Sequence, residues 1–546
     1  MESVLSQKYF LGFFILILLG NLLLYNPQMA LWDEDEAAYA GFALNMIESG
    51  DWVNPDFFWS EKHWKPPFHF WTIAISYKIF GVNEFATRLP SVIFSLLTLL
   101  AIVFLGGRGF GRPKAMMAAM ILGSTLLFPS LAKMAVTDMT LLFFETVAAL
   151  SLFLFIKTPN WKIGALFWTA VSLGLLVKGP PILIMAGGTW FFLLLFKSTR
   201  TNAVRLHPWF FLPLALLPLF AWGYFSWQKD GGETVQFMID WYILKRAGGS
   251  VLGQTGPPGY HLGVMILAFL PVIAFFPAAL KDLWVHIRKK ETEALFLGGW
   301  LLCGWIFYEI MPSKLPAYAV GAYPAIAILI AYQVEGLLSG KSPYLKWIKG
   351  SSIFFMVIMF VVVVAIILGA YQLFGRPGFM RAIMAGTVLW GVGLFAAISL
   401  FSENFRQGIT ASLTFGLAIT FLSYWAIVPL LDSQRSINRT TSIIVNNVLE
   451  DQSNLALAND IPEDPSLAFY LSKHWDGSYF HEKDHQKIID GIQGEDPYAA
   501  LVGEKIFPLL PLQKDTILLN ELKVDSIVGR ASESLEPVKY YLLRKD

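Results

Sequence analysis

Acidic side chains and a lysine gather beside the first hydrophobic segment of the chain. Trp32-Asp33-Glu34-Asp35-Glu36 has four consecutive acids, and Trp64-Lys65-Pro66-Pro67 follows further along. Neighbouring carboxylates repel one another and perturb each other's pKa values, as catalytic carboxylates often do. Asp33-Glu34-Asp35 also has the D-x-D spacing of sites that bind a divalent metal with a nucleotide sugar, although three residues are a weak signal. The structural alternative is that Asp35 and Glu36 only complement the dipole of a helix that starts there, worth about 0.3 to 1 kcal/mol.

A second acid, Asp138, stands where an apolar segment begins, in Ala132-Lys133-Met134-Ala135-Val136-Thr137-Asp138-Met139-Thr140. Thr137 could cap the helix, which leaves Asp138 to project toward the outside near the bilayer. An ionised carboxylate fully immersed in a bilayer costs about 2.5 to 3.5 kcal/mol, so an acid at its boundary is a functional hypothesis by default. The alternative is that Asp138 is itself a simple N-terminal cap.

Three lysines stand beside prolines in predicted turns. Lys65 precedes Pro66-Pro67, Lys178 precedes Gly179-Pro180-Pro181, and Lys314 lies in Pro312-Ser313-Lys314-Leu315-Pro316-Ala317-Tyr318. An ammonium held by a rigid turn suits an anionic ligand such as a lipid phosphate. Each lysine taken singly could instead extend to lipid headgroups, as long cationic side chains do at a membrane surface.

The composition places these residues in a polytopic membrane protein. Of 546 residues, 55% are hydrophobic and only 15% are charged, with a mean hydropathy of +0.54, whereas a soluble domain has roughly 25% charged residues. A membrane-spanning helix needs about 20 mostly apolar residues. The first apolar run lacks an A-x-A-like cleavage site and leads straight into the acids, so we interpret it as a retained helix. Such runs predict about thirteen helices, at 8–25, 88–106, 114–131, 138–156, 162–177, 180–196, 209–227, 260–280, 294–311, 316–336, 350–373, 380–401 and 409–430.

Lysine and arginine residues in alternate short loops predict the orientation. Basic loops lie at 108–114, 157–162, 197–205, 281–290 and 341–349, and loops of this kind face the cytoplasm. The N-terminus is then inside and the C-terminal tail outside. The remaining loops all face the same non-cytoplasmic side, and they carry Asp35, Lys65, Asp138, Lys178, Arg246 and Lys314.

The chain divides into a transmembrane domain, 1–431, and a periplasmic domain, 432–546. Within the first external loop, 29–87, we predict a helix from Asp35 to Ser49, with acids in its first turn and Gly50 past its end, and a second one from Phe68 to near Gly81. The polar tail contains strand-like runs at 455–458, 466–471, 525–528 and 538–543, which favour a small α/β domain of about 110 residues. The predicted fold class is a polytopic α-helical membrane protein with a C-terminal α/β domain.

Several functional classes lack their signals. Lys and Arg number 41 against 40 Asp and Glu, a net charge of +1 that points to no nucleic-acid partner. The single cysteine, Cys303, lies in an apolar run and excludes an intrachain disulfide. His63, His69 and His261 lack the spacing of a zinc site and suit interface or packed positions. Without a GxxxxGK[ST] loop, a GxGxxG after a strand or a G-x-S-x-G elbow, the chain is not expected to hydrolyse ATP or bind a dinucleotide.

The motifs together resemble those of a known enzyme class. The chain is similar to membrane-embedded glycosyltransferases of the GT-C class, in the branch that contains the aminoarabinose transferases that modify lipid A and, more distantly, the protein O-mannosyltransferases. Asp138 also falls where the family has its second acid, and the resemblance covers nearly all of the membrane region, with thirteen helices expected in both. Four short motifs match in order, namely Asp35-Glu36-Ala37-Ala38-Tyr39-Ala40 followed by Glu48-Ser49-Gly50-Asp51-Trp52, Lys65-Pro66-Pro67, Lys178-Gly179-Pro180, and Ser313-Lys314-Leu315-Pro316-Ala317-Tyr318 followed by Pro324.

The resemblance implies transfer of a sugar from a polyprenyl phosphate to an acceptor, with inversion at the sugar carbon. Asp35 would act as general base or orient the acceptor, and Asp138 would assist or stabilise positive charge at the anomeric carbon. The departing phosphate would be held by Lys65, Lys314, Tyr318 and Arg246. Glu36, Tyr39 and Lys178 complete the predicted substrate-binding residues.

Two departures from the family pattern fall in the same loop. Where the aminoarabinose transferases have Asp-Glu-x-Arg, the fourth position here is Ala38, and where they have an acid directly before Lys-Pro, this chain has Trp64. That acid takes part in a metal site in the family, so its loss argues against metal binding here. We assign no metal ligands and no cofactor, and a divalent metal stays open as the disfavoured alternative. An aromatic at position 64 could stack on a sugar ring. The sugar and the acceptor, whether lipid, lipopolysaccharide or protein, stay open.

We therefore predict a polyprenyl-phosphate-sugar-dependent glycosyltransferase of a bacterial inner membrane, active on its periplasmic side. The alternative from another class is a transporter or flippase of lipid-linked saccharides, in which the lysines bind phosphate without catalysis. A carrier usually has polar residues near the bilayer midplane, whereas here the charge is predicted to gather at one face. A third reading is a scaffold whose C-terminal domain binds other cell-envelope proteins.

Overall fold

The structure is a computed structural model that describes residues 8–32, 35–245, 255–435, 437–449, 455–458, 460–472, 479–480, 485–493, 498–510, 522–530 and 537–545. It is mostly helical, with one small sheet. Its residues group into two compact units, each described by itself. The first contains Met1–Asn26, Trp52–Asn54 and Lys65–Ile427, and the second contains Pro27–Asp51, Pro55–Trp64 and Val428–Asp546.

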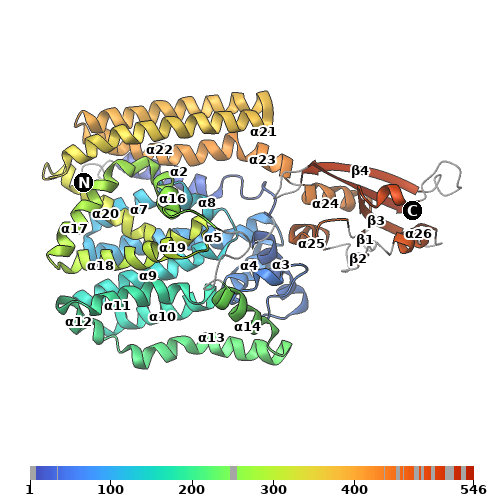
Figure 1. Ribbon diagram of the computed structural model, residues 1–546, viewed down its shortest axis with the longest axis horizontal. Helices are drawn as coiled ribbons and strands as arrows, with labels where there is room; N and C mark the ends of the chain where they lie inside the picture. The colour runs from blue at the N-terminus through green and yellow to red at the C-terminus, as the bar shows by residue number, and fades with distance from the viewer. Residues whose placement is uncertain are drawn as a thin grey trace. The chain divides into compact units, whose positions relative to one another are not determined.

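Long helices lie side by side in the first unit, with α21 (Leu345–Phe401) and α22 (Phe405–Ala426) along one edge and α13 (Pro208–Asp230) along the opposite edge (Figure 1). The most enclosed apolar helix of this unit is α9 (Thr137–Lys157), which packs against α5 (Glu84–Ala101) and α10 (Trp161–Lys178). Local sequence explains the ends of α10. The Asn160 side chain accepts the Lys162 N–H at its start, and Gly179 follows its last residue with a φ of 75°, which favours glycine.

The other helical elements of the first unit complete the bundle and its connections. They are α2 (Lys8–Leu23), α4 (Phe68–Phe80), η2 (Ile102–Gly106), α6 (Gly107–Phe110), α7 (Arg112–Gly123), α8 (Leu127–Ala132), η3 (Leu183–Gly187), α11 (Gly188–Leu194), α12 (Lys197–Val204), α14 (Glu233–Met238), η4 (Ile239–Lys245), α16 (Tyr260–Ala268), η5 (Leu270–Phe275), α17 (Phe276–Arg288), α18 (Thr292–Leu301), η6 (Leu302–Ile306), α19 (Phe307–Ile310), η7 (Pro316–Ala322) and α20 (Tyr323–Leu338).

Among the described residues, eight helices are long and apolar enough to cross a membrane, or nine if the bent pair Tyr260–Ala268 and Val272–Arg288 is one span. The count of thirteen therefore stays a prediction. The other predicted runs fall on shorter or interrupted helices. Phe10–Leu23 and Leu183–Leu194 are apolar but short, and the run at 114–131 is divided between α7 and α8. Two more predicted runs, 350–373 and 380–401, share α21, which is interrupted at Gly375 by a φ of 62°.

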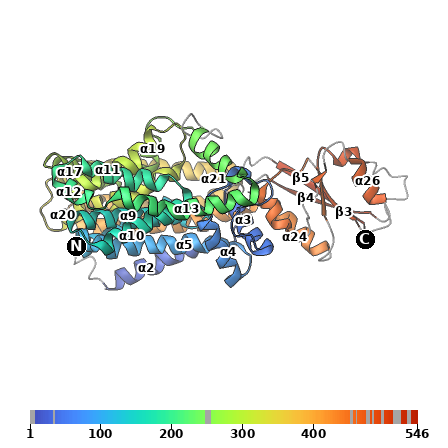
Figure 2. The ribbon, with the colours of Figure 1, turned by 90° about the horizontal axis from the view of Figure 1, so that it is seen from below.

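The second unit contains a five-stranded sheet in the order β2-β1-β3-β5-β4. β2 (Tyr479–Phe480), β1 (Leu455–Ala458) and β3 (Tyr498–Gly503) are parallel, whereas β5 (Pro537–Lys545) is antiparallel to β3 and to β4 (Leu522–Arg530). Alternating side chains form two cores. Helices α24 (Ile437–Val448) and α25 (Pro465–Leu471) contribute to one core, and α26 (His485–Gln493) contributes to the other, on the opposite face (Figure 2).

The remaining elements of the second unit are α3 (Asp35–Ser49), η1 (Glu61–His63), α23 (Val428–Arg435) and η9 (Phe507–Leu509). The predicted helix from Asp35 to Ser49 is confirmed, as are the strands at 455–458, 525–528 and 538–543. The strand predicted at 466–471 is wrong, because this run is helix α25. Pro465 stands at its first position with a φ suited to a helix, and the Asp464 carbonyl accepts the first helical N–H groups.

Candidate active site

Asp35 is the first residue of α3, where the helix dipole favours a negative charge. Its Oδ1 accepts a hydrogen bond from the Tyr39 hydroxyl at 2.7 Å and lies 3.1 Å from His63 Nδ1. Tyr39 is one turn further along α3, and His63 is the last residue of η1. The Asp35 side chain is 48% exposed and that of His63 only 6% exposed. A half-exposed carboxylate is therefore oriented by two buried groups.

His63 was not predicted as a partner of Asp35; its sequence position suggested only a metal ligand or an interface or packed residue. In the family pattern a cation stands beside the acid, at the position occupied here by Ala38, which is fully buried. His63 brings an N–H group to the same carboxylate from another element. The available signal was its place next to Trp64, in the motif that departs from the family.

Glu36 is almost fully buried, and its Oε2 accepts the Trp32 N–H at 2.9 Å. The Trp32 carbonyl in turn accepts the Ala37 N–H at 2.9 Å. These two bonds attach the segment that precedes α3 to the first turn of the helix. Glu36 thus has a structural contact that supports the position of Asp35, in addition to its predicted place among substrate-binding residues.

Asp138 and Lys178 form an ion pair in the first unit, with 2.8 Å between Oδ1 and Nζ. Asp138 lies in the first turn of α9, and Lys178 is the last residue of α10. Lys178 Nζ is also 5.8 Å from the centre of the Tyr318 ring. The side chains of Lys178 and Asp138 are only 17% and 14% exposed. The structure therefore brings three predicted residues together in a place that is largely withdrawn from water.

Lys314 and Lys65 are also buried in the first unit. Lys314 Nζ donates to the Glu309 carbonyl at 2.6 Å and to the Tyr308 carbonyl at 3.4 Å. The Tyr308 ring lies beside the Tyr318 ring, with centroids 6.0 Å apart. Lys65 Nζ lies 5.3 Å from the centre of the Tyr242 ring. Both lysines therefore lie inside the first unit, Lys314 against backbone carbonyls and Lys65 against an aromatic ring.

Glu145 is a buried acid that sequence analysis missed. It lies on α9 two turns beyond Asp138, and its Oε2 would be 2.5 Å from a Cβ atom placed on Gly321 of η7. An acid inside an apolar span is a functional hypothesis by default, and that signal was present in the sequence. Its contact with Gly321 sets the spacing between α9, which carries Asp138, and η7, which carries Tyr318.

His69 and His261 are held by protein groups. His69 Nδ1 is 2.9 Å from Thr140 Oγ1, and burial lowers the pKa of His69 to about 3, so its ring is neutral near pH 7. His261 Nε2 is 3.1 Å from the Leu315 carbonyl. Over the part of the chain that the structure describes, no three His, Cys, Asp or Glu residues converge as a metal site would require.

Arg246 lies outside the described residues, as do Asp33 and Glu34 of the D-x-D motif. The phosphate-binding role of Arg246 stays a prediction, and the weak D-x-D signal is not tested.

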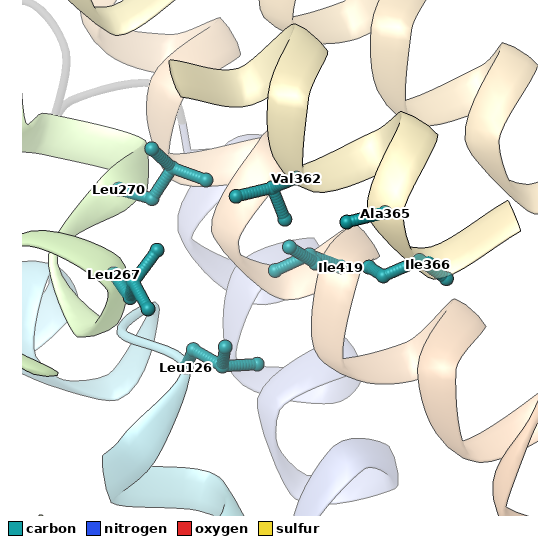
Figure 3. Close-up of a pocket in the computed structure, with 7 residues that line it drawn as sticks. All are labelled: Leu126, Leu267, Leu270, Val362, Ala365, Ile366 and Ile419. Carbon is teal, nitrogen blue, oxygen red and sulfur yellow. The ribbon is translucent and has the colours of Figure 1, made fainter. Parts of the chain in front are cut away.

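An apolar pocket of about 320 Å³ lies in the first unit between α16, η5, α21 and α22 (Figure 3). Hydrocarbon side chains line it without a charged group, so it suits a stretch of hydrocarbon rather than a phosphate. The lining residues are Leu126, Leu267, Leu270, Val362, Ala365, Ile366 and Ile419.

A solved structure shares this architecture. ArnT from Cupriavidus metallidurans, bound to undecaprenyl phosphate, superposes with a TM-score of 0.75 over 98% of each chain, at 20% sequence identity. The apo state of the same protein gives a TM-score of 0.72. The chain therefore has the GT-C fold, with several apolar helices and a small C-terminal sheet.

Sequence comparisons point to the same class. The family described as dolichyl-phosphate-mannose-protein mannosyltransferase matches residues 64–225. Undecaprenyl phosphate-alpha-4-amino-4-deoxy-L-arabinose arabinosyl transferase of Yersinia pestis is 27% identical over 496 residues, which cover 86% of this chain and 84% of the relative. The enzyme of that name from Aeromonas hydrophila is 26% identical over 487 residues, 84% of this chain and 83% of the relative.

The chain is thus a multi-pass membrane glycosyltransferase of the GT-C class. Within that class its sequence is similar to the aminoarabinose transferases over most of its length and to the protein mannosyltransferases over residues 64–225, as the sequence motifs predicted.

Proposed function

We propose that the protein transfers a sugar from a polyprenyl phosphate to a hydroxyl or phosphate of a glycolipid, lipopolysaccharide or protein acceptor, with inversion at the sugar carbon. The observation that carries this proposal is the Asp35 carboxylate, half-exposed and oriented by Tyr39 and His63. The relatives named above act with undecaprenyl phosphate sugars, and the solved neighbour binds undecaprenyl phosphate, which supports a donor of the same chemistry.

Asp35 serves as the general base. It accepts the proton of the acceptor hydroxyl as the acceptor oxygen attacks the anomeric carbon. A hydrogen bond from an N–H or O–H group favours the ionised form that a base requires, and Tyr39 and His63 supply such donors. Glu36 supports the first turn of this helix through Trp32.

The cations of the first unit serve the leaving phosphate. As the glycosidic bond breaks, the lipid phosphate becomes a dianion, and charge-assisted hydrogen bonds favour that state. Lys65, Lys314 and Arg246 bind the phosphate, with Tyr318 as a further donor. Lys178 holds Asp138, which stabilises positive charge at the anomeric carbon. The apolar pocket suits part of the prenyl chain.

The protein acts in a bacterial inner membrane, with its N-terminus in the cytoplasm and both the reaction and the C-terminal domain in the periplasm. The basic loops at 108–114 and 281–290 support this orientation.

Mass spectrometry of envelope glycolipids and glycoproteins, from cells with and without the gene, tests the proposal. We expect one product to gain the mass of a sugar only when the gene is present. Envelopes with the same masses in both strains would refute the transferase assignment.

The variant Asp35→Asn should express normally and bind undecaprenyl phosphate, while transfer falls about a hundredfold or more, the typical cost of a lost general base. Full activity would remove Asp35 from the mechanism. His63→Asn keeps an N–H at the place of Nδ1 and is the matched control for His63→Leu. It should retain more activity than His63→Leu.

Lys314→Ala should mainly weaken binding of undecaprenyl phosphate, and unchanged affinity would exclude Lys314 from the phosphate site.

A further inference from the structure

Three elements of the C-terminal chain bind the backbone of the segment just before Asp35. Asp432 of α23 accepts the Ala30 N–H at 3.0 Å, and the Tyr470 hydroxyl of α25 accepts the Leu31 N–H at 2.8 Å. Arg439 of α24 donates to the Gln28 carbonyl. All of these residues belong to the second compact unit. Residues 28–31, here called the strap, are therefore fixed from several directions.

The strap leads directly into the helix that carries Asp35. Ala30 and Leu31 are buried, and Trp32 is bonded to the first turn of α3 through its N–H and its carbonyl. Helix α3 also packs against α25. A shift of Tyr470 relative to α3 would therefore move the backbone at the start of that helix.

A second connection runs to His63, the partner of Asp35. The side chains of Phe57 and Trp59 pack against the core between the sheet and helices α24 and α25. A Cβ atom on Gly41 of α3 would lie 2.1 Å from the Phe57 ring, so only glycine permits this approach. The segment that ends at His63 therefore packs against the domain to which the strap is hydrogen-bonded.

We infer that the C-terminal domain positions the Asp35 carboxylate for catalysis, with Tyr470 and Asp432 as positioning residues. This inference rests on the proposed role of Asp35 as general base. The domain fixes the position of the Asp35 carboxylate through two connections, the strap before α3 and the segment that ends at His63. Transfer is sensitive to such placement, because a displacement of about 1 Å can cost about a hundredfold in rate.

The test uses the full chain in membrane vesicles with the substrates identified by mass spectrometry. Tyr470→Phe removes the acceptor of the Leu31 N–H and should lower transfer about tenfold, a partial misplacement of the base. Binding of undecaprenyl phosphate and the thermal unfolding temperature should change little. Tyr498→Phe is the matched control, because its hydroxyl lies in the same domain, is buried and has no hydrogen-bond partner among the described residues. This control should retain wild-type transfer.

A second pair of variants separates positioning from folding. Asp432→Asn keeps an oxygen that accepts the Ala30 N–H and should retain transfer, whereas Asp432→Ala should lose it. In an Asp35→Asn background, Tyr470→Phe should cause no further loss, because it acts through the group already removed.

Wild-type transfer by both Tyr470→Phe and Asp432→Ala would overturn the inference while leaving the proposed function intact. Equal losses of transfer and lipid binding, with a lower unfolding temperature, would also overturn it, because the domain would then serve only stability. Absence of any product with the wild-type chain would instead refute the proposed function.

Discussion

Helix α9 carries an ion pair at each end, and the two pairs lie in different surroundings. At its start Asp138 binds Lys178, with side chains 14% and 17% exposed. At its end Lys157 binds Glu293 at 3.1 Å, with side chains 40% and 41% exposed. Exposed pairs contribute about 0 to 1 kcal/mol, whereas removing one partner of a buried pair costs about 3 to 5 kcal/mol. Taking two charges out of water is itself costly, so a buried ion pair is a poor way to stabilise a fold. The buried position of Asp138 and Lys178 therefore indicates a function other than stability.

The two ends also differ in their neighbours. Tyr318 lies beside Lys178, and the buried Glu145 and His69 lie nearby on α9 and α4. At the other end Lys157 donates to the Gly109 carbonyl, and Glu293 accepts from the Tyr332 hydroxyl, which are contacts that tie helices together. Buried titratable groups thus gather at the end of α9 that carries the proposed site.

The largest difference is expected from removing each lysine in turn. Lys178→Met leaves Asp138 largely buried without its cation, so transfer should fall about a hundredfold and stability should fall by on the order of 3 kcal/mol. Lys157→Met is the matched control and should change transfer little. Initial rates in vesicles and thermal unfolding in detergent provide the measurements. Equal effects of the two variants would abolish the distinction between the ends.

A methyl group on Gly321 should disturb only the site end. In Gly321→Ala the new Cβ would lie 2.5 Å from Glu145 Oε2, which forces the carboxylate or η7 to move. Transfer should fall about tenfold, because Tyr318 shifts with η7. Gly187→Ala adds the same methyl group where, apart from its own helix, no atom of the described residues lies within 4 Å, and it should be silent. A silent Gly321→Ala would show that Glu145 does not set the spacing of α9 and η7.

Acid should destabilise the protein through His69. Burial lowers its pKa from 6.5 to about 3 in the folded state, so the unfolded state binds the extra proton between these values. Stability therefore falls as the pH drops below about 6.5 toward 3 and is independent of this group above that range. His69→Asn keeps a donor for Thr140 but does not titrate, so its unfolding temperature should decline less between pH 7 and pH 4. An identical decline in both proteins would contradict the buried neutral histidine.

The smallest effect concerns the exposed pair. A double-mutant cycle of Lys157→Ala and Glu293→Ala should give a coupling energy of about 0.5 kcal/mol that decreases with added salt. Unfolding free energies at low and high salt measure it. A coupling of several kcal/mol, insensitive to salt, would mean that this end resembles the buried one.

Much of the fold followed from local sequence. The acids Asp35 and Glu36 marked the start of α3 and Gly50 marked its end, and the helix has the predicted bounds. Such signals can be recognised in the sequence because they act within one turn of the chain. The run at 466–471 was misjudged, because a short apolar run has no periodicity that separates a buried strand from a buried helix. The number of spans was also hard to predict, because two predicted runs can share one helical element. The runs at 350–373 and 380–401 both lie in α21, which has a non-helical residue at Gly375.

The site was predicted as single residues rather than as contacts. Asp138 and Lys178 were both expected to act, yet their pairing depends on how α9 and α10 pack. His63 and Glu145 were missed for the same reason, since their partners Asp35 and Gly321 come from other elements. The C-terminal domain was predicted as a separate periplasmic domain of unassigned role, whereas Tyr470 binds Leu31 across 439 positions of sequence.

The sequence by itself determined the membrane class, most helices and the identity of the acids and lysines, because hydrophobicity and short motifs are local properties. The tertiary structure alone decided which groups meet. Burial of the pair of Asp138 and Lys178, orientation of Asp35 by His63, and attachment of the strap to the C-terminal domain all depend on packing between distant segments, and no local pattern encodes such packing.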